Sequence, residues 1–192
     1  MPFTRTLIAA LLVAPVGTAF ADVVQLADRA LFNQQGTIAV TSNFDDFAPS
    51  VTTLNGQFYR GDIAYKDTAV FGKNSPYVSP HRNTIGTKNL PPSEMVLAPG
   101  TRYSLLGFDT AVEAAAPVTF VMTTNLGKFS FPDVSLPSGK EAIVFKGFAT
   151  TKPGEYFISF LITTPDDYIG ITDISLGNIA PTAGAGAAAK KP

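Results

Sequence analysis

Short runs of β-branched and aromatic residues follow one another through most of this 192-residue chain, and turn signals separate them. Such runs are typical of β-strands, because branched and aromatic side chains pack well on a pleated surface. By residue number, the runs are 37–42, 58–65, 68–71, 94–97, 102–108, 118–124, 128–131, 142–149, 155–163 and 169–178. About ten short strands at this spacing favour a sandwich or a barrel.

Helices have little room in this pattern. The chain contains 16 Gly and 15 Pro, and only residues 22–32 could form a helix, which Gln35-Gly36 would end soon. No segment is long enough for the crossover helix of a parallel α/β sheet. The sequence therefore predicts an all-β fold.

Apolar side chains alternate along several of these runs. In residues 58–65, Tyr59, Ile63 and Tyr65 fall on one face, which predicts that these tyrosines are in the core. In residues 155–163, one face would carry Tyr156, Ile158, Phe160 and Ile162. Phe157 and Leu161 would lie on the other, so both faces of this strand could be covered.

The last run changes its apolar face in the middle. Ile169 and Ile171 share a face with Asp173, whereas Ile174 and Leu176 take the opposite one. Three explanations are open: a β-bulge, a strand covered on both faces, or an inward Asp173 that needs a cation or hydrogen-bond donors.

The ends of the chain predict export. Residues 1–21 combine Arg5, an apolar stretch over 7–16 and the cleavage site Ala19-Phe20-Ala21, which is the pattern of a signal peptide. We expect a single β-sandwich domain over 22–178, a disordered Ala/Gly/Pro-rich tail over 179–192, and a periplasmic or extracellular location. The apolar stretch is too short for a membrane span.

Composition excludes several function classes. The chain has no Cys, which excludes redox and thiol-metal chemistry, and its single His excludes multi-histidine zinc sites. A net charge of −1 gives no reason to expect nucleic acid as a partner.

Several short motifs occur in one order along the chain. They lie at residues 44–47, 59–65, 105–109, 145–148, 156–160 and 169–177. Together they resemble exported bacterial proteins with jelly-roll, lectin-like or carbohydrate-binding-module-like domains, many of which carry a C-terminal Pro-Glu-Pro sorting signal. The resemblance implies an antiparallel β-sandwich of jelly-roll type. This chain ends in Lys190-Lys191-Pro192, so we expect no surface anchoring by that sorting route.

The same resemblance implies one structural calcium ion, held by acids of the first and last strands. Calcium takes six to eight oxygen ligands. Asp45, Asp46 and Asp173 could supply part of that set. The alternative is that Asp45 and Asp46 stand in a turn and that Asp173 is solvated.

Glycan binding is a second possibility. Residues 71–92 form the least regular stretch, and long irregular loops in small domains are often functional. Tyr77, His81 and Arg82 are its candidate ligand-binding residues, with Tyr77 as an exposed aromatic ring. The chain has no Trp, which is the commonest platform for sugars.

Catalysis has weaker support in the sequence. Asp62, Asp109, Glu113 and Asp133 could act in glycoside hydrolysis only if two of them lie roughly 5 to 10 Å apart. His81 has no Gly-x-Ser-x-Gly nucleophile elbow to serve. Arg60-Gly61-Asp62 spells an adhesion motif, but it falls inside an expected strand, where the two charges would form a same-face ion pair.

The sequence thus predicts an exported, non-catalytic binding or structural β-sandwich, whose partner could be a glycan or another cell-surface component. A carbohydrate-binding module with a structural calcium is the first alternative. A secreted glycan-active enzyme is the second.

Overall fold

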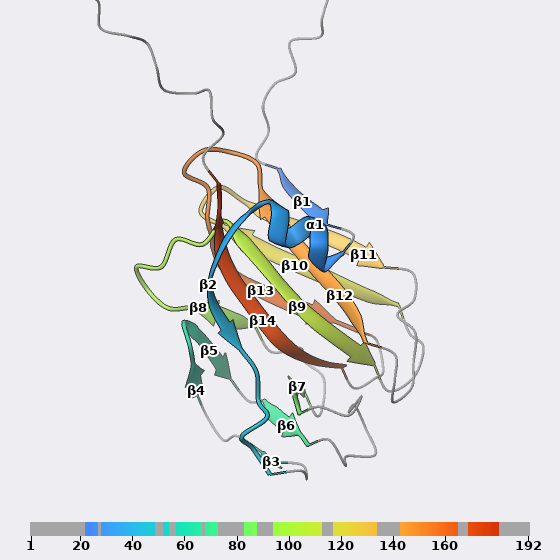
Figure 1. Cartoon of the computed structure of the whole chain (residues 1–192). Coiled ribbons are helices and arrows are strands. Elements are labelled where there is room, and N and C mark those ends of the chain that lie inside the picture. Colours follow the sequence, from blue (N-terminus) through green and yellow to red (C-terminus); the bar gives the residue numbers. More distant parts are fainter. Residues whose placement is uncertain are drawn as a thin grey trace, which may run out of the picture.

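Two antiparallel β-sheets packed face to face form this protein (Figure 1). The computed structural model describes residues 22–26, 28–48, 52–53, 57–66, 68–72, 83–87, 94–112, 117–133, 143–164 and 169–180. The expected antiparallel β-sandwich is confirmed. These residues form fourteen strands rather than about ten, because three short strands were not expected and one expected strand is a hairpin.

Sheet A contains eight strands. In spatial order they are β1 (Val23–Leu26), β12 (Val144–Thr150), β9 (Leu105–Val112), β14 (Ile169–Ile179), β7 (Thr84–Thr87), β6 (Ala69–Phe71) and β3 (Thr52–Thr53), with β2 (Gly36–Ser42) also paired to β14. The last strand of the chain therefore lies in the middle of this sheet, next to one of the first.

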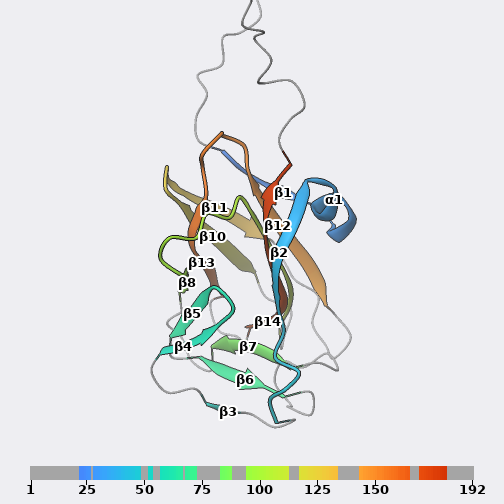
Figure 2. The same ribbon diagram turned by 60° about the vertical axis from the view of Figure 1, so that its left-hand side comes forward.

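Sheet B contains six strands. In spatial order they are β11 (Lys128–Asp133), β10 (Val118–Thr124), β13 (Phe157–Thr163), β8 (Met95–Leu97), β5 (Ile63–Lys66) and β4 (Gln57–Arg60). Figure 2 shows the two sheets as separate layers, with the short helix α1 (Arg29–Gln34) on the outer side of sheet A.

Phenylalanine rings fill the space between the sheets. Phe108 of β9 stacks on Phe160 of β13 across the sandwich, with ring centroids 5.6 Å apart. Phe120 and Phe148 lie 5.8 and 6.1 Å from Phe108, and all four rings are fully buried. Each such ring stabilises the fold by about 1.5–3 kcal/mol through burial alone.

Helix α1 rests on the outer face of sheet A through Phe32, which is fully buried. Beneath it, Gly107 and Gly147 are cross-strand partners. A Cβ atom on Gly107 would lie 3.0 Å from the Phe32 ring, and one on Gly147 would lie 3.1 Å from it. The two glycines therefore form a flat seat for the ring.

The expected helix over 22–32 is wrong in its bounds. Residues Val23–Leu26 form β1, which pairs with β12, and the helix begins only after Asp28. The Asp28 side chain accepts a hydrogen bond from the Leu31 amide at 2.8 Å, as an N-cap does.

A β-bulge in β14 explains the change of apolar face in this strand. Thr172 pairs with Asp109 and Ser175 with Gly107, so β14 has one extra residue there. Asp173 has a φ of +47°, in the left-handed region. Because of the extra residue, Ile171 before the bulge and Ile174 after it both pack in the same core. Of the three explanations, the bulge is confirmed.

Two more irregularities overturn expected strand faces. The run 58–65 is a hairpin whose turn is Gly61-Asp62, with a φ of +56° at Gly61. In β13, Ser159 pairs with Thr123 and Phe157 with Thr124, which leaves Ile158 as an extra residue. Phe157 is therefore in the core and Ile158 is exposed, the reverse of the expected arrangement.

At its C-terminal side the fold extends slightly beyond the expected domain. Strand β14 runs through Ile179, whose amide donates to Ser104 Oγ at 2.8 Å. Residues 1–21 and 181–192 lie outside the described residues, so the signal peptide and the disordered tail stay predictions. In the described part of the chain, no helix is long and apolar enough to cross a membrane.

Candidate functional site

One row of side chains crosses the outer face of sheet B on all six strands. The cross-strand partners are Tyr59–Ala64, Ala64–Val96, Val96–Ser159, Ser159–Thr123 and Thr123–Lys128. Partners in an antiparallel ladder share a face. Their neighbours along the strands, such as Leu97, Phe160 and Met122, belong to the core. This Tyr59 row therefore faces outward, and at about 4.8 Å per strand it spans about 24 Å.

Large apolar side chains are exposed at this row. Tyr59 is 62% exposed and Val96 is 39% exposed. Ile158, the extra residue of the β13 bulge, is 41% exposed beside Ser159. An exposed cluster of this kind on a regular sheet is typical of a binding surface rather than of solvated structure.

The sequence placed Tyr59 in the core, and this prediction is wrong. The alternation was read through Gly61 as if one strand continued, but the chain reverses there. The hairpin puts Tyr65 in the core, fully buried, and Tyr59 on the outer face. The signal that could have revealed this is Gly61-Asp62, because Gly followed by Asp can form a two-residue hairpin turn.

Polar groups flank the apolar side chains of the Tyr59 row. Ser159 is only 3% exposed, and its hydroxyl donates to the Glu94 carboxylate. Gln57 and Lys66 are cross-strand partners two residues away from Tyr59 and Ala64, so they share the outer face. Small-molecule and glycan sites combine apolar surface with a few fixed polar groups in this way.

The turns at one end of sheet B are joined by hydrogen bonds. Asn125 of the β10–β11 turn donates from its backbone to the Tyr156 carbonyl and accepts from the Tyr156 amide at 2.8 Å. Beneath them, the buried Glu155 accepts a hydrogen bond from Thr124 Oγ1 at 2.7 Å. These bonds hold the 125–127 and 151–156 turns in one arrangement.

Tyr103 and Asp62 join two further turns at this end. The Tyr103 hydroxyl donates to Asp62 Oδ2, and the Tyr103 carbonyl accepts from the Phe157 amide. The hydrogen bond to the Asp62 carboxylate, together with burial, raises the pKa of Tyr103 to about 12. The turn next to Tyr59 is therefore fixed by a charge-assisted bond.

The adhesion motif Arg60-Gly61-Asp62 does not lie inside one strand, as expected, because Arg60 ends β4 and Gly61 and Asp62 form the hairpin turn. The expected Arg60–Asp62 pair is also wrong. Arg60 forms an ion pair with Asp46 at 2.7 Å and stacks over Phe44 and Phe47, while Asp62 accepts from Tyr103. Both the Arg60 and the Asp62 side chains therefore have partners within the protein.

Two of the three candidate calcium ligands, Asp45 and Asp46, lie in one turn of the structure. Asp45 and Asp46 stand in a turn that Asn83 holds by donating to the Phe44 and Phe47 carbonyls. The hydrogen bond from Arg60 lowers the pKa of Asp46. Among the described residues, no group of three or more acidic or His side chains could hold a metal ion. The calcium site stays a prediction.

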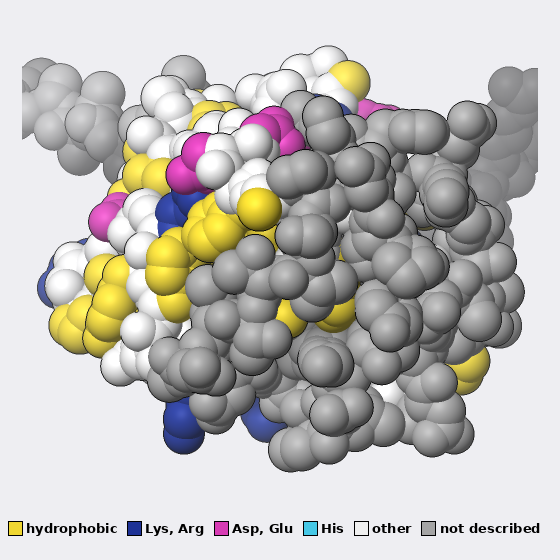
Figure 3. Space-filling model, turned by 90° about the horizontal axis from the view of Figure 1, so that it is seen from below, with side chains coloured by type: hydrophobic (Ala, Val, Ile, Leu, Met, Phe, Trp, Pro, Cys, Tyr) yellow, Lys and Arg dark blue, Asp and Glu magenta, His cyan; other side chains and the backbone are white. Residues whose placement is uncertain are grey.

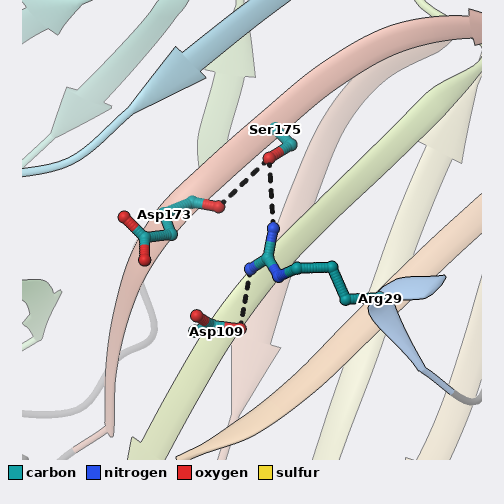
Figure 4. A network of polar contacts seen from close by, with 4 residues as sticks. All are labelled: Arg29, Asp109, Asp173 and Ser175. Atoms are coloured by element: carbon teal, nitrogen blue, oxygen red, sulfur yellow. Dashed lines mark hydrogen bonds and ion pairs between the residues drawn. The ribbon is translucent and has the colours of Figure 1, made fainter. Parts of the chain in front are cut away.

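Asp173 lies beside a polar network that ties α1 to sheet A (Figure 4). Arg29 of α1 forms an ion pair with Asp109 at 2.7 Å and lies 3.5 Å from the Ser175 hydroxyl. Ser175 in turn donates to the Asp173 carbonyl at 3.3 Å. Asp173 thus contributes its backbone to this network, which anchors the helix at the bulge.

The other expected site residues are placed as follows. Tyr77, His81, Arg82 and Glu113 lie outside the described residues, as does the side chain of Asp133. Of the candidate hydrolytic acids, Asp62 is bonded to Tyr103 and Asp109 to Arg29. The described part of the lower face, seen in Figure 3, presents hydrophobic side chains beside both Lys or Arg and Asp or Glu groups.

Comparisons with known proteins add little to this geometry. No family model matches the chain, and a search of curated proteins gives no match. Among solved structures, the chain is similar to the enzymatically active domain of tailspike protein 4 of bacteriophage CBA120, with 17% identity and a TM-score of 0.34. The similarity covers 68% of this chain and 19% of the tailspike chain. At this TM-score it carries no argument about function.

Proposed function

We propose that this protein is an exported, non-catalytic β-sandwich that binds a glycan across the outer face of sheet B. The observation that carries the proposal is Tyr59, a tyrosine with 62% of its surface exposed on a regular sheet. Burial of an aromatic ring is favourable, so an exposed one on a rigid strand is suited to stack on the apolar face of a sugar.

The shape of the Tyr59 row supports an extended ligand. The row is about 24 Å long, since it crosses six neighbouring strands. Its exposed apolar side chains, Tyr59, Val96 and Ile158, are too few for the roughly 1,200–2,000 Å² of a stable protein interface. A single glycan chain needs less apolar area.

The acids on this face support binding rather than cleavage. Glycoside hydrolysis needs two carboxyl groups that flank the scissile bond. The described residues place Glu94 on this face, where its carboxylate accepts from Ser159. Among the described side chains of the Tyr59 row, there is no second carboxylate that could act together with Glu94.

Substitution of Tyr59 tests the proposal. We expect Tyr59→Ala to weaken binding to polysaccharides about thirtyfold, because an aromatic anchor contributes about 2 kcal/mol. Tyr59→Phe should bind nearly as well, since the ring remains. The measurement is retardation of the protein in gels that contain a panel of soluble polysaccharides.

Leu31→Ala is the matched control, because Leu31 is 42% exposed on α1, on the other side of the sandwich. It should leave retardation unchanged. Equal binding by wild-type protein and Tyr59→Ala would show that the site lies elsewhere. Release of sugar products by the wild-type protein would favour the alternative of a glycan-active enzyme.

A further inference from the structure

Among the Lys and Arg side chains that the structure describes, some form ion pairs and others do not. Arg29 and Arg60 form ion pairs with Asp109 and Asp46. Lys66, Lys128 and Arg102 form no ion pair with any residue that the structure describes. All three belong to sheet B or to the loop that follows β8.

Two of these cations lie on the outer face itself. Lys128 is the last residue of the Tyr59 row and is exposed on β11. Lys66 pairs with Gln57, which lies two residues, or about 7 Å, from Tyr59 along β4. The aromatic ring therefore has a cation near it, and the far end of the row has another.

Arg102 adds a third positive charge at the end of the sheet. Its guanidinium lies 5.6 Å from the centroid of the Tyr156 ring, in the turn region that Asn125 holds. Stacking on an aromatic ring fixes the orientation of an Arg side chain and leaves its positive charge available to a ligand.

Two described carboxylates lie near this face, and both keep their negative charge. The Glu94 carboxylate accepts from Ser159, and the Asp62 carboxylate accepts from Tyr103, so each is held in place by a hydroxyl group. Three cations against two acids leave the described residues here with a small positive excess, although the chain as a whole has a net charge of −1. Such a face concentrates anionic ligands and selects against neutral ones.

We infer that the ligand of the Tyr59 row is an anionic polysaccharide, whose carboxylate or sulfate groups meet Lys66 and Lys128 while a sugar ring stacks on Tyr59. This inference rests on the proposed glycan-binding function and adds the charge class of the glycan. An anionic membrane surface would offer the same kind of charge, and the vesicle measurement below distinguishes it from a polysaccharide.

The test compares charged polymers with their neutral counterparts. The probes are polygalacturonate, alginate and a sulfated galactan, beside the methyl-esterified forms of the first two and the desulfated form of the third. We expect the purified protein to bind at least one charged polymer, at least tenfold more tightly than its neutral form. Binding should weaken as salt rises from 0.05 to 0.5 M, because salt screens exposed charges.

Variants that each remove one positive charge show which lysines contribute to binding of the charged polymer. Lys66→Gln and Lys128→Gln should each weaken binding to the charged polymer about three- to fivefold, the range of an exposed ion pair. Lys146→Gln is the control, since it removes the same charge from β12, where the Lys146 ammonium lies 5.6 Å from the centroid of the Phe120 ring and not on the outer face of sheet B. It should change binding by less than twofold.

The outcomes separate the inference from the function on which it rests. Equal binding of charged and neutral polymers, with loss in Tyr59→Ala, would overturn the anionic ligand and keep the glycan site. Binding to no polymer, or binding that Tyr59→Ala leaves intact, would overturn both. Equally tight, Lys66-dependent binding to phosphatidylglycerol vesicles would identify a membrane surface instead and overturn the inference.

Discussion

Asp173 shows how one residue can decide the pairing of a whole strand. Its left-handed backbone adds the extra residue of the bulge, which brings Ile171 and Ile174 into the same core. At this point β14 also changes its neighbour. It pairs with β7 up to Ile171, and from Ile174 onward it pairs with β2. The calcium role of its carboxylate stays a prediction, and the role that the structure shows is that of its backbone.

We therefore expect the cost of substitution at Asp173 to follow backbone preference. Asp173→Asn should be nearly neutral, because Asn tolerates left-handed φ values. Asp173→Val should lower the free energy of unfolding by about 1–2 kcal/mol, because a β-branched side chain is strained there. Urea unfolding of both variants measures the difference, and equal stabilities would contradict this account of the bulge.

At the scale of elements, the seat of α1 on sheet A is the contact most sensitive to added volume. Gly107 and Gly147 lie under the Phe32 and Phe145 rings, and a Cβ on Gly107 would come within 2.9 Å of Phe145 and 3.0 Å of Phe32. The Arg29–Asp109 ion pair fixes the helix from its other side. The helix therefore has little freedom to move aside.

Gly107→Ala should lower the free energy of unfolding by about 1–3 kcal/mol, the usual cost of overpacking. In a Phe32→Leu background part of this cost should disappear, because one of the two opposing rings has been shortened. A double-mutant cycle by chemical denaturation measures the coupling. Strictly additive effects would show that Phe32 does not rest on Gly107.

The elements also show what the sequence could predict. Strands β10 and β11 follow directly from alternating apolar residues and the turn between them, and the sandwich follows from many such strands. The change of apolar face in residues 169–178 offered the bulge at Asp173 as one of three explanations. The hairpin at Gly61-Asp62 and the bulge at Ile158 could not be read from alternation, since the first reverses the chain and the second shifts the pattern by a residue. Tyr59 was assigned to the wrong face for this reason alone.

For the molecule as a whole, the turns at the end of sheet B set an alkaline limit on stability. The Tyr103–Asp62 bond needs a protonated phenol, and it raises the pKa of Tyr103 from 10.0 to about 12. Below pH 10 the phenol is protonated in both the folded and the unfolded chain, so the bond contributes in full. Above pH 10 the unfolded chain loses this proton first, and the contribution decreases as pH rises through about 12.

Tyr103→Phe should accordingly be less stable than the wild-type protein by about 1.5 kcal/mol at pH 8, the value of a hydrogen bond to a charged group. This difference should shrink as pH rises from 10 to 12. Urea unfolding of both proteins across that range measures it, and comparison at each pH cancels the titration of other groups. A difference that does not change with pH would mean that the phenol does not donate to Asp62.

The central position of β14 in sheet A also has a consequence for the order in which the protein can assemble. The strand that joins β9 to β2 and β7 is the last to be synthesised. Until it arrives, sheet A remains three separate pieces with unpaired edges, namely β1-β12-β9, β7-β6-β3 and the single strand β2. Sheet A can therefore form in full only after β14 has been synthesised, and a nascent chain that lacks β14 should not reach the native sandwich.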